Sequence, residues 1–220
     1  MKKVLLAIFL PVVVLSLNLI ASGQTGDKSA DEQMFQAIEK GDFEVVLQQL
    51  DQGAHVNAQG KDGVTALIAA SAMGKVDAVK QLLAKGANTD LKDSRGNTAL
   101  HYAVMVSNFE EAKLLVEKGA NVNIQQEGGL SPLMLSVVSG SVDTMKLLLD
   151  KGANTEARDK DGFTALMGAS GGGVIDMVKL LLDRGANVDA KSNDDTTALK
   201  LAVNNGKTDV AALLREKGAK

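Results

Sequence analysis

Apolar residues come in pairs of short runs over most of the chain, and a glycine separates the two runs of each pair. In the stretch 61–93, the first run covers residues 66–73 and Gly74 follows it. The second run, 76–85, has four large apolar residues at helical spacing: Val76, Val79, Leu82 and Leu83. The pattern predicts two short helices over these two ranges, each with one face to bury.

The same pattern returns every 33 residues. The turn glycine stands at Gly63, Gly96, Gly129 and Gly162, and Asp195 takes the next place. A Gly-Ala pair begins at positions 53, 86, 119, 152, 185 and 218. Helices of about 8 to 10 residues are too short to be stable alone in water, so each pair must pack against the next. A fixed period of this length predicts an all-α solenoid of stacked units.

Turn and cap signals mark where each helix begins and ends. Asp62-Gly63 predicts a tight turn, and the Thr65 hydroxyl predicts the N-cap of the first helix. Gly74 ends that helix, and Gly86 is placed for a left-handed C-terminal cap of the second. These signals predict a turn and two antiparallel helices in each unit.

The repeats resemble the ankyrin family. Counterparts of its Thr-Pro-Leu-His signature begin at Thr65, Thr98, Ser131, Thr164 and Thr197. Its Gly-Ala-Asn-x-Asn/Asp ending stands at 119–123 and 185–189. The resemblance covers about residue 31 to the C-terminus. It implies an ankyrin-repeat solenoid with β-turn fingers and a concave face on which partner proteins dock. It implies no common catalytic site.

The predicted domain, residues 31–220, divides into six units, including the two end caps. Their ranges are 31–60, 61–93, 94–126, 127–159, 160–192 and 193–220. The first unit lacks the turn and the threonine, and its helices are predicted at 33–40 and 43–52. Both end units carry many polar residues, as terminal repeats of a solenoid must. The array therefore favours a monomer.

The N-terminus has the layout of a secretory signal peptide. Lys2 and Lys3 precede a mostly apolar stretch, 4–20, and the small residues Ala21-Ser22-Gly23 follow it. We expect cleavage after Gly23, with cleavage after Ala21 or Ser22 as alternatives, and residues 24–30 as a flexible lead-in. An uncleaved anchor is the other interpretation. The prediction is a periplasmic or secreted bacterial protein that has no membrane segment after cleavage.

Composition narrows the function classes. The formal charge is −3, and losing Lys2 and Lys3 makes it −5, with no basic run, so nucleic-acid binding is not expected. Cysteine is absent, which excludes disulfides and thiolate chemistry. Aromatic residues make up 3% of the chain, so the core must be aliphatic. We expect neither a cofactor nor a metal.

Polar residues with possible chemistry all have a structural interpretation. His101 occupies the signature histidine position and His55 a turn, without partners at metal-ligand spacing. The acidic groups at 159–161, 189 and 194–195 lie at turns, where such residues are favoured. The 159–162 segment only faintly resembles a calcium loop. Gly171-Gly172-Gly173 is interpreted as a weakened helix end rather than a phosphate cradle.

The concave face is the remaining candidate site. The residues after the turn glycine and those near the ends of the first helices are apolar in the middle repeats, and exposed apolar patches mark interaction sites. The predicted partner-binding residues are Val64, Ala72, Met73, Asn97, Met105, Val106, Leu130, Val138 and Phe163. The alternative is that these side chains only pack between units. Soft-metal binding by the methionines is a minor alternative, because Met73, Met105, Met134 and Met167 do not share one repeat position.

Three function classes follow. The first is a non-enzymatic module that binds a protein of unknown identity through the concave face. The second is an accessory or protective factor in the envelope, since the chain resembles small exported bacterial ankyrin proteins associated with catalase and peroxide defence. The third is an enzyme, which would require turnover that depends on His101 or on an acidic pair. The sequence favours the first class.

Overall fold

The computed structural model describes residues 29–220. The predicted signal peptide, 1–23, and residues 24–28 of the predicted lead-in lie outside the described residues. Within residues 29–220 the chain forms twelve α-helices and one 3-10 turn, η1, and no strand. No helix in this range has the length and apolarity that a membrane span needs.

The helices form pairs, one pair in each 33-residue unit. Their bounds are α2 (Ala30–Lys40), α3 (Phe43–Asp51), η1 (Lys61–Gly63), α4 (Ala66–Ala72), α5 (Val76–Ala84), α6 (Ala99–Met105), α7 (Phe109–Glu117), α8 (Pro132–Ser139), α9 (Val142–Asp150), α10 (Ala165–Gly172), α11 (Ile175–Asp183), α12 (Ala198–Asn204) and α13 (Thr208–Glu216).

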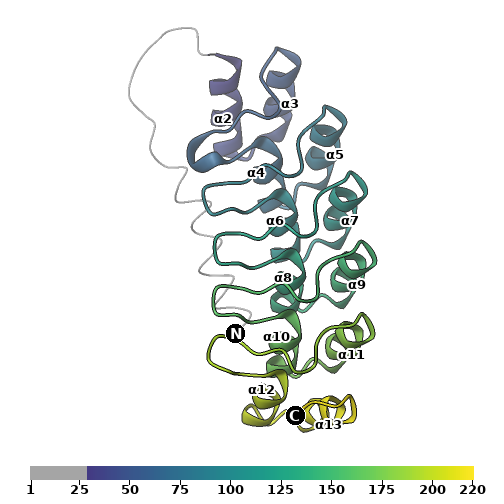
Figure 1. Ribbon diagram of the computed structural model, residues 1–220. Coiled ribbons are helices and arrows are strands. Elements are labelled where there is room, and N and C mark those ends of the chain that lie inside the picture. Colours follow the sequence, from purple (N-terminus) through teal and green to yellow (C-terminus); the bar gives the residue numbers. More distant parts are fainter. Residues whose placement is uncertain (1–28) are drawn as a thin grey trace.

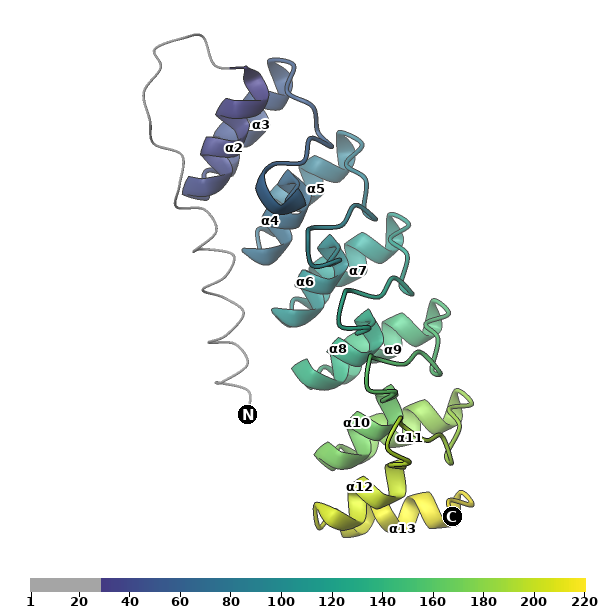
Figure 2. The same ribbon diagram turned by 60° about the vertical axis from the view of Figure 1, so that its left-hand side comes forward.

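Two layers of helices make up the stack. In Figure 1 the first helices of the pairs, α2 to α12, lie in one column and the second helices, α3 to α13, in another. The turns that precede the first helices project from the first column as a row of fingers. Figure 2 shows the pairs following one another from α2 and α3 at one end to α12 and α13 at the other. The predicted all-α solenoid of helix-turn-helix units is confirmed.

Hydroxyl caps start the first helices where the sequence predicts. The Thr65 hydroxyl accepts the N–H of Ile68 at 3.1 Å, and Ser131 accepts that of Met134 at 3.4 Å. Gly86 has φ +84°, the left-handed conformation expected of a C-terminal cap. The first unit differs from the prediction. Its first helix begins at Ala30 rather than at residue 33, because the Ser29 hydroxyl accepts the N–H of Glu32 and caps it earlier.

The core is a column of aliphatic side chains at fixed repeat positions. The leucine of the signature is at most 1% exposed at Leu67, Leu100, Leu133 and Leu166. A second column comes from the second helices and is fully buried: Leu82, Leu115, Leu148, Leu181 and Leu214. Full burial of such a side chain contributes about 1.5–3 kcal/mol. These columns supply the stability that helices of seven to eleven residues lack alone.

A ladder of hydrogen bonds joins each unit to the next. The acceptors are polar side chains at one repeat position, which recurs every 33 residues. Each accepts the backbone N–H of a residue in the next unit, 31 positions later in the chain, at 2.7 to 2.9 Å. The pairs are Asn57 with Asn88, Asp90 with Asn121, Asn123 with Asn154, Glu156 with Asn187 and Asp189 with Lys220. Neighbouring fingers are joined as well, for example by the Glu127 N–H and the Arg95 carbonyl at 2.8 Å. The fingers are therefore held in register by backbone as well as side-chain contacts.

Ser107 is the one residue in its repeat position that is not glycine within units 2 to 6. Gly74, Gly140, Gly173 and Gly206 link the two helices of their units with φ between +63° and +75°, and Ser107 has φ +59°. A left-handed conformation costs an L-residue about 1–2 kcal/mol. The exposed Ser107 therefore strains the link between α6 and α7.

We expect Ser107→Gly to raise the free energy of unfolding by about 1 kcal/mol, because glycine adopts this conformation without the steric cost. Urea unfolding at neutral pH measures the change. Ser107→Ala is the matched control, since it keeps the Cβ and should give no gain. Equal stability of the two variants would contradict the strain at Ser107.

Candidate functional site

The predicted partner-binding residues differ in how far solvent reaches them. Val138 is 47% exposed. Asn97 is buried. The other residues are intermediate in exposure: Val64, Ala72, Met73, Met105, Val106, Leu130 and Phe163. Most of the predicted side chains therefore pack partly against the core, with one face left toward solvent.

Asn97 is the clearest difference from the expected exposed finger tip. Its N–H donates to Asp93 Oδ1 at 2.8 Å, and its side-chain amide lies 3.4 Å from Asp93 Oδ2. The Tyr102 hydroxyl donates to the same Oδ2 at 2.6 Å. The buried Asp93 carboxylate draws the finger back onto α6, so position 97 points toward the helices. In every finger, the residue after the turn glycine position is half-buried or buried.

Three of the predicted residues, Val64, Ala72 and Met73, line one opening of about 190 Å³. It lies between the first unit, the second unit and the fingers at 60–62 and 93–95. Side chains of α2, α4 and α6 complete its lining: Phe35, Ile38, Glu39, Ile68, Ala69 and Tyr102. We call this opening the first groove pocket. We call the surface formed by the fingers and the exposed side of the first helices the groove face.

The wall of the pocket near α6 is fixed by Asp93. Besides Asn97 and Tyr102, the carboxylate accepts the N–H of Arg95 at 2.9 Å. Burial raises the pKa of Tyr102, and the hydrogen bond to Asp93 raises it further. Tyr102 therefore stays protonated and keeps donating to Asp93. Both oxygens of the Asp93 carboxylate therefore accept hydrogen bonds from its own finger or from Tyr102 of α6.

His101 organises the start of α6. Its Nδ1 accepts the N–H of Thr98 at 3.2 Å and lies 2.9 Å from the Thr98 hydroxyl. The ring is fully buried. Burial lowers the pKa of His101 to about 4, and the neighbouring backbone of Leu130 and Ile124 and the charge of Asp93 offset this only in part. His101 is therefore neutral at physiological pH and acts as a helix cap. No group of three or more metal-ligand side chains forms within residues 29–220.

His55 joins the turn after α3 to the start of α2 in the same unit. Its N–H donates to Asp31 Oδ1 at 2.7 Å, and its Nδ1 lies 2.9 Å from Asp31 Oδ2. These two hydrogen bonds lower the pKa of Asp31. The His55 side chain is largely exposed, so it joins the turn to α2 at the surface.

The acidic residues of the fingers hold the turns together. Asp159 Oδ1 accepts the N–H of Asp161 at 3.0 Å and that of Phe163 at 2.8 Å. Asp93 makes the same arrangement two fingers earlier, 66 residues before Asp159. One oxygen of the Asp159 carboxylate is therefore bound by two backbone N–H groups of its own turn.

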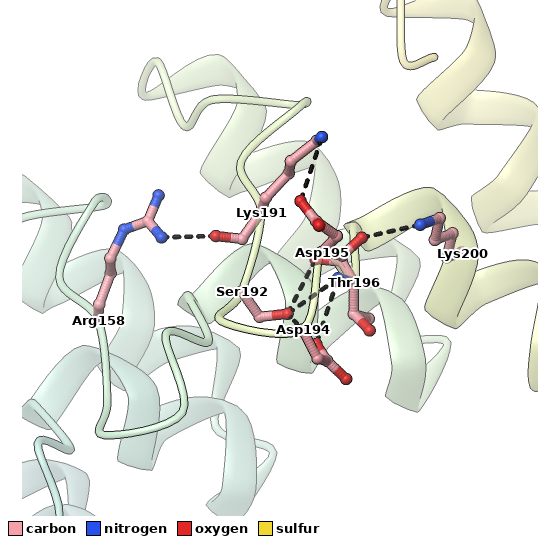
Figure 3. Close-up of polar contacts among 7 residues, drawn as sticks. All are labelled: Arg158, Lys191, Ser192, Asp194, Asp195, Thr196 and Lys200. Carbon is pink, nitrogen blue, oxygen red and sulfur yellow. Dashed lines mark hydrogen bonds and ion pairs between the residues drawn. The ribbon is translucent and has the colours of Figure 1, made fainter.

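The last finger uses a serine in place of that aspartate (Figure 3). Ser192 Oγ accepts the N–H of Thr196 at 3.0 Å and donates to Asp194 Oδ1 at 2.5 Å. Hydrogen bonds from Ser192, and then from Thr196, lower the pKa of Asp194. Lys191 pairs with Asp195 at 3.3 Å. Each acidic side chain in this finger has a local partner.

The glycine triplet belongs to a helix end. Gly171 and Gly172 are the last residues of α10, and Gly173 caps the helix in a left-handed conformation with φ +75°. The Gly173 N–H donates to Ser170 O at 3.2 Å. Each glycine inside a helix lowers its stability by about 1 kcal/mol relative to alanine. The triplet is a weak end of α10.

Glu111 is a buried carboxyl group that the sequence reasoning missed. It is fully buried in α7, with Oε2 3.2 Å from the Asn108 amide nitrogen and no partner for Oε1. Burial raises the pKa of Glu111 to about 7, and the nearby Ser71 hydroxyl opposes this only in part. The repeat could have revealed this burial. The residues at the same repeat position in other units are buried as well: Ala78, Thr144, Met177 and Val210. A carboxyl group in a position that is otherwise a core position indicates a buried titratable site.

We expect Glu111→Gln to stabilise the protein at pH 8 and to leave its stability at pH 5 nearly unchanged. The pKa of Glu111 in the folded protein is about 7, above its ordinary value of 4.5. Below pH 4.5 the buried carboxyl group is neutral and costs no stability, and the wild-type protein loses stability as pH rises through 7 and this group ionises. The difference at pH 8 should be on the order of 2 kcal/mol. His101 has a lowered pKa, so it reduces the stability of the protein as pH falls from 6.5 to 4. This effect is present in both wild type and Glu111→Gln, so it does not change the difference between them.

Urea unfolding of both proteins at the two pH values measures this difference. Glu110→Gln is the matched control, because Glu110 is the exposed neighbour in the same helix. A pH-independent difference for Glu111→Gln, or an equal effect of Glu110→Gln, would show that Glu111 does not titrate as described.

Comparison with protein families agrees with the repeat geometry. A family model described as ankyrin repeats in three copies matches residues 34–126, 108–159 and 133–220. Comparison with curated proteins gives no match. The matched segments together span most of the chain, so the chain belongs to the ankyrin-repeat family, whose members generally mediate protein–protein interactions.

Proposed function

We propose that this protein is exported and binds a partner protein through its groove face, as a non-enzymatic interaction module. The observation that carries the proposal is the first groove pocket, where Val64, Ala72 and Met73 leave apolar surface open between two units. The family supports the coarser part of the proposal, since ankyrin repeats typically bind proteins. The layout of residues 1–23 supports export.

The repeat register separates packing positions from surface positions. Leucine stands at positions 67, 100, 133 and 166, because the side chain there must fill the same space in the core of each unit. Positions on the groove face have no such packing requirement. One of its register positions carries six different residues: Glu39, Ala72, Met105, Val138, Gly171 and Asn204. This variety on a shared scaffold gives the groove face a distinct chemical surface in each unit, which suits recognition of one partner.

The polar groups that could suggest an enzyme make structural contacts, although the buried Nε2 of His101 has no hydrogen-bond partner in the described residues. His101 caps a helix, and Asp93 and Asp159 close fingers. The inference to a binding function therefore rests on surface shape and apolar exposure, which mark interaction sites on monomers.

We expect Val138→Glu to weaken capture of the native partner at least tenfold, because a charge would enter an apolar part of the groove face. The position tolerates glutamate in this fold, since Glu39 occupies it in the first unit. Chemical cross-linking and pull-down from the native envelope fraction, with mass spectrometry, measure the capture.

Val203→Glu is the matched control. Val203 is 49% exposed, but its repeat position is buried between units elsewhere, as at Ser71 and Val104. It therefore faces the end of the stack rather than the groove. Equal capture by Val138→Glu and wild type, with both variants folded, would contradict binding through the groove face.

We expect the protein isolated from its native source to lack residues 1–23. Intact mass spectrometry of the purified protein measures this directly. A mass that includes Met1 to Gly23 would overturn cleavage and favour the uncleaved anchor.

A further inference from the structure

The first groove pocket exists because two small residues stand where neighbouring units carry large ones. Ala72 occupies the position of Met105, and Ala69 occupies that of Tyr102. Both alanines line the pocket, and Tyr102 bounds it from the next unit. At the far side, the Phe35 ring is so close to the finger that a Cβ at Gly60 would lie 2.7 Å from it. Large rings on both sides and methyl groups on the floor leave the space open.

Small residues alone do not open the groove. Gly168 and Gly171 occupy the same two positions in the fifth unit. There the neighbouring side chains close in, because a Cβ at Gly171 would lie 3.4 Å from Asn205 and 3.5 Å from Leu201. The opening at Ala69 and Ala72 lies in the second unit, where Tyr102 and Phe35 bound it.

The volume of the pocket limits what it can hold. Sites for small-molecule ligands measure about 300–1,000 Å³. The first groove pocket measures about 190 Å³ and lies open to the groove face. This volume suits a single large apolar side chain of a longer segment that continues along the groove.

The pocket is also preformed. Tyr102 and the finger at 93–97 are tied to the buried Asp93, and the Ser94 N–H donates to the Asp62 carbonyl at 2.6 Å. Phe35 belongs to α2, whose Met34 and Ile38 are buried in the core. A segment that enters this pocket would have little of the protein to order, which favours binding.

Charge is concentrated at the same end of the stack. Residues 31–60 hold six carboxylates and one lysine, a net charge of −5, whereas residues 61–220 hold twenty basic and twenty acidic residues. On α2, Glu32 and Glu39 are seven residues apart and so share one helix face with Phe35 between them. Both glutamates are exposed, and Glu39 lines the pocket. Lys61 and Arg95 line the opposite, finger side of the pocket, so its acidic border is the α2 side. An apolar opening with this border complements a segment that is apolar and places one basic residue against α2.

We propose that the first groove pocket binds an extended segment of the partner, with one large apolar side chain between Ala69 and Ala72 and a lysine or arginine against Glu32 and Glu39. The proposal rests on the proposed function, because it names the partner chemistry that one part of the groove face recognises.

Selection from a random peptide display library on the folded protein tests this proposal. We expect enriched peptides to share one Leu, Met or Phe next to Lys or Arg, and synthetic copies to bind at least tenfold more weakly when sodium chloride rises from 0.05 M to 0.5 M. Ala72→Met fills the pocket with the side chain that Met105 already places in this position. It should weaken binding of these peptides at least tenfold, and Ala69→Leu, which copies Leu135, should do the same.

Glu39→Lys and Glu44→Lys form a charge-matched pair. Both change the first unit by two charges, but Glu39 lies at the pocket and Glu44 in the first turn of α3. Glu39→Lys should weaken peptide binding at least tenfold and Glu44→Lys less than twofold. Thermal melting confirms that each variant is folded.

Several results would overturn the proposal. These are enriched peptides without basic residues, equal binding by Ala72→Met and wild type, equal effects of the two lysine variants, or no enrichment at all. If bound peptides or the native partner are sensitive to Val138→Glu but not to Ala72→Met, the proposed function stands and this inference fails.

Discussion

Contact between neighbouring units is the constraint on which the structure depends. No helix in residues 29–220 exceeds eleven residues, so none is stable without its neighbours. The leucine columns supply the apolar burial, and the ladder of Asn, Asp and Glu side chains sets the offset between units. The same hydrogen bond, between residues 31 positions apart, joins each unit to the next. Neighbouring units are therefore held at the same offset along the stack. A rigid row of fingers and first helices follows, and the groove face is its surface.

The repeat made most of the fold predictable from the sequence. A leucine or a threonine in register has the same task in each unit, so helix positions, caps and core could be derived from one copy. Two differences have local causes. The first helix starts earlier because Ser29 caps it. Asn97 is buried because Asp93 binds both its N–H and its side-chain amide, and Asp159 holds the N–H of Phe163 in the same way. The burial of Glu111 was not predicted, although the same repeat position holds the buried residues Ala78, Thr144, Met177 and Val210.

The candidate site was predictable only in part. Three of the nine predicted residues, Val64, Ala72 and Met73, line the first groove pocket. The other predicted residues are spread along the groove, mostly half-buried, with Val138 the exposed member. The sequence alone could not show which of these residues border an open pocket. That depends on whether side chains of the next unit cover a small residue. Asn205 and Leu201 lie beside Gly171, whereas Ala72 lines the first groove pocket. Export and a role in peroxide defence stay predictions.

In the proposed mode of recognition, a partner binds the acidic end of the groove face while the stack itself stays unchanged. Amide hydrogen exchange of the folded protein, alone and saturated with an enriched peptide, tests this most directly. We expect slower exchange in the second half of α2, in the fingers at 60–64 and 93–97 and at the end of α4, with no change in α9 to α13. Protection confined to the middle fingers or to α12 and α13, with the first two units unchanged, would contradict it.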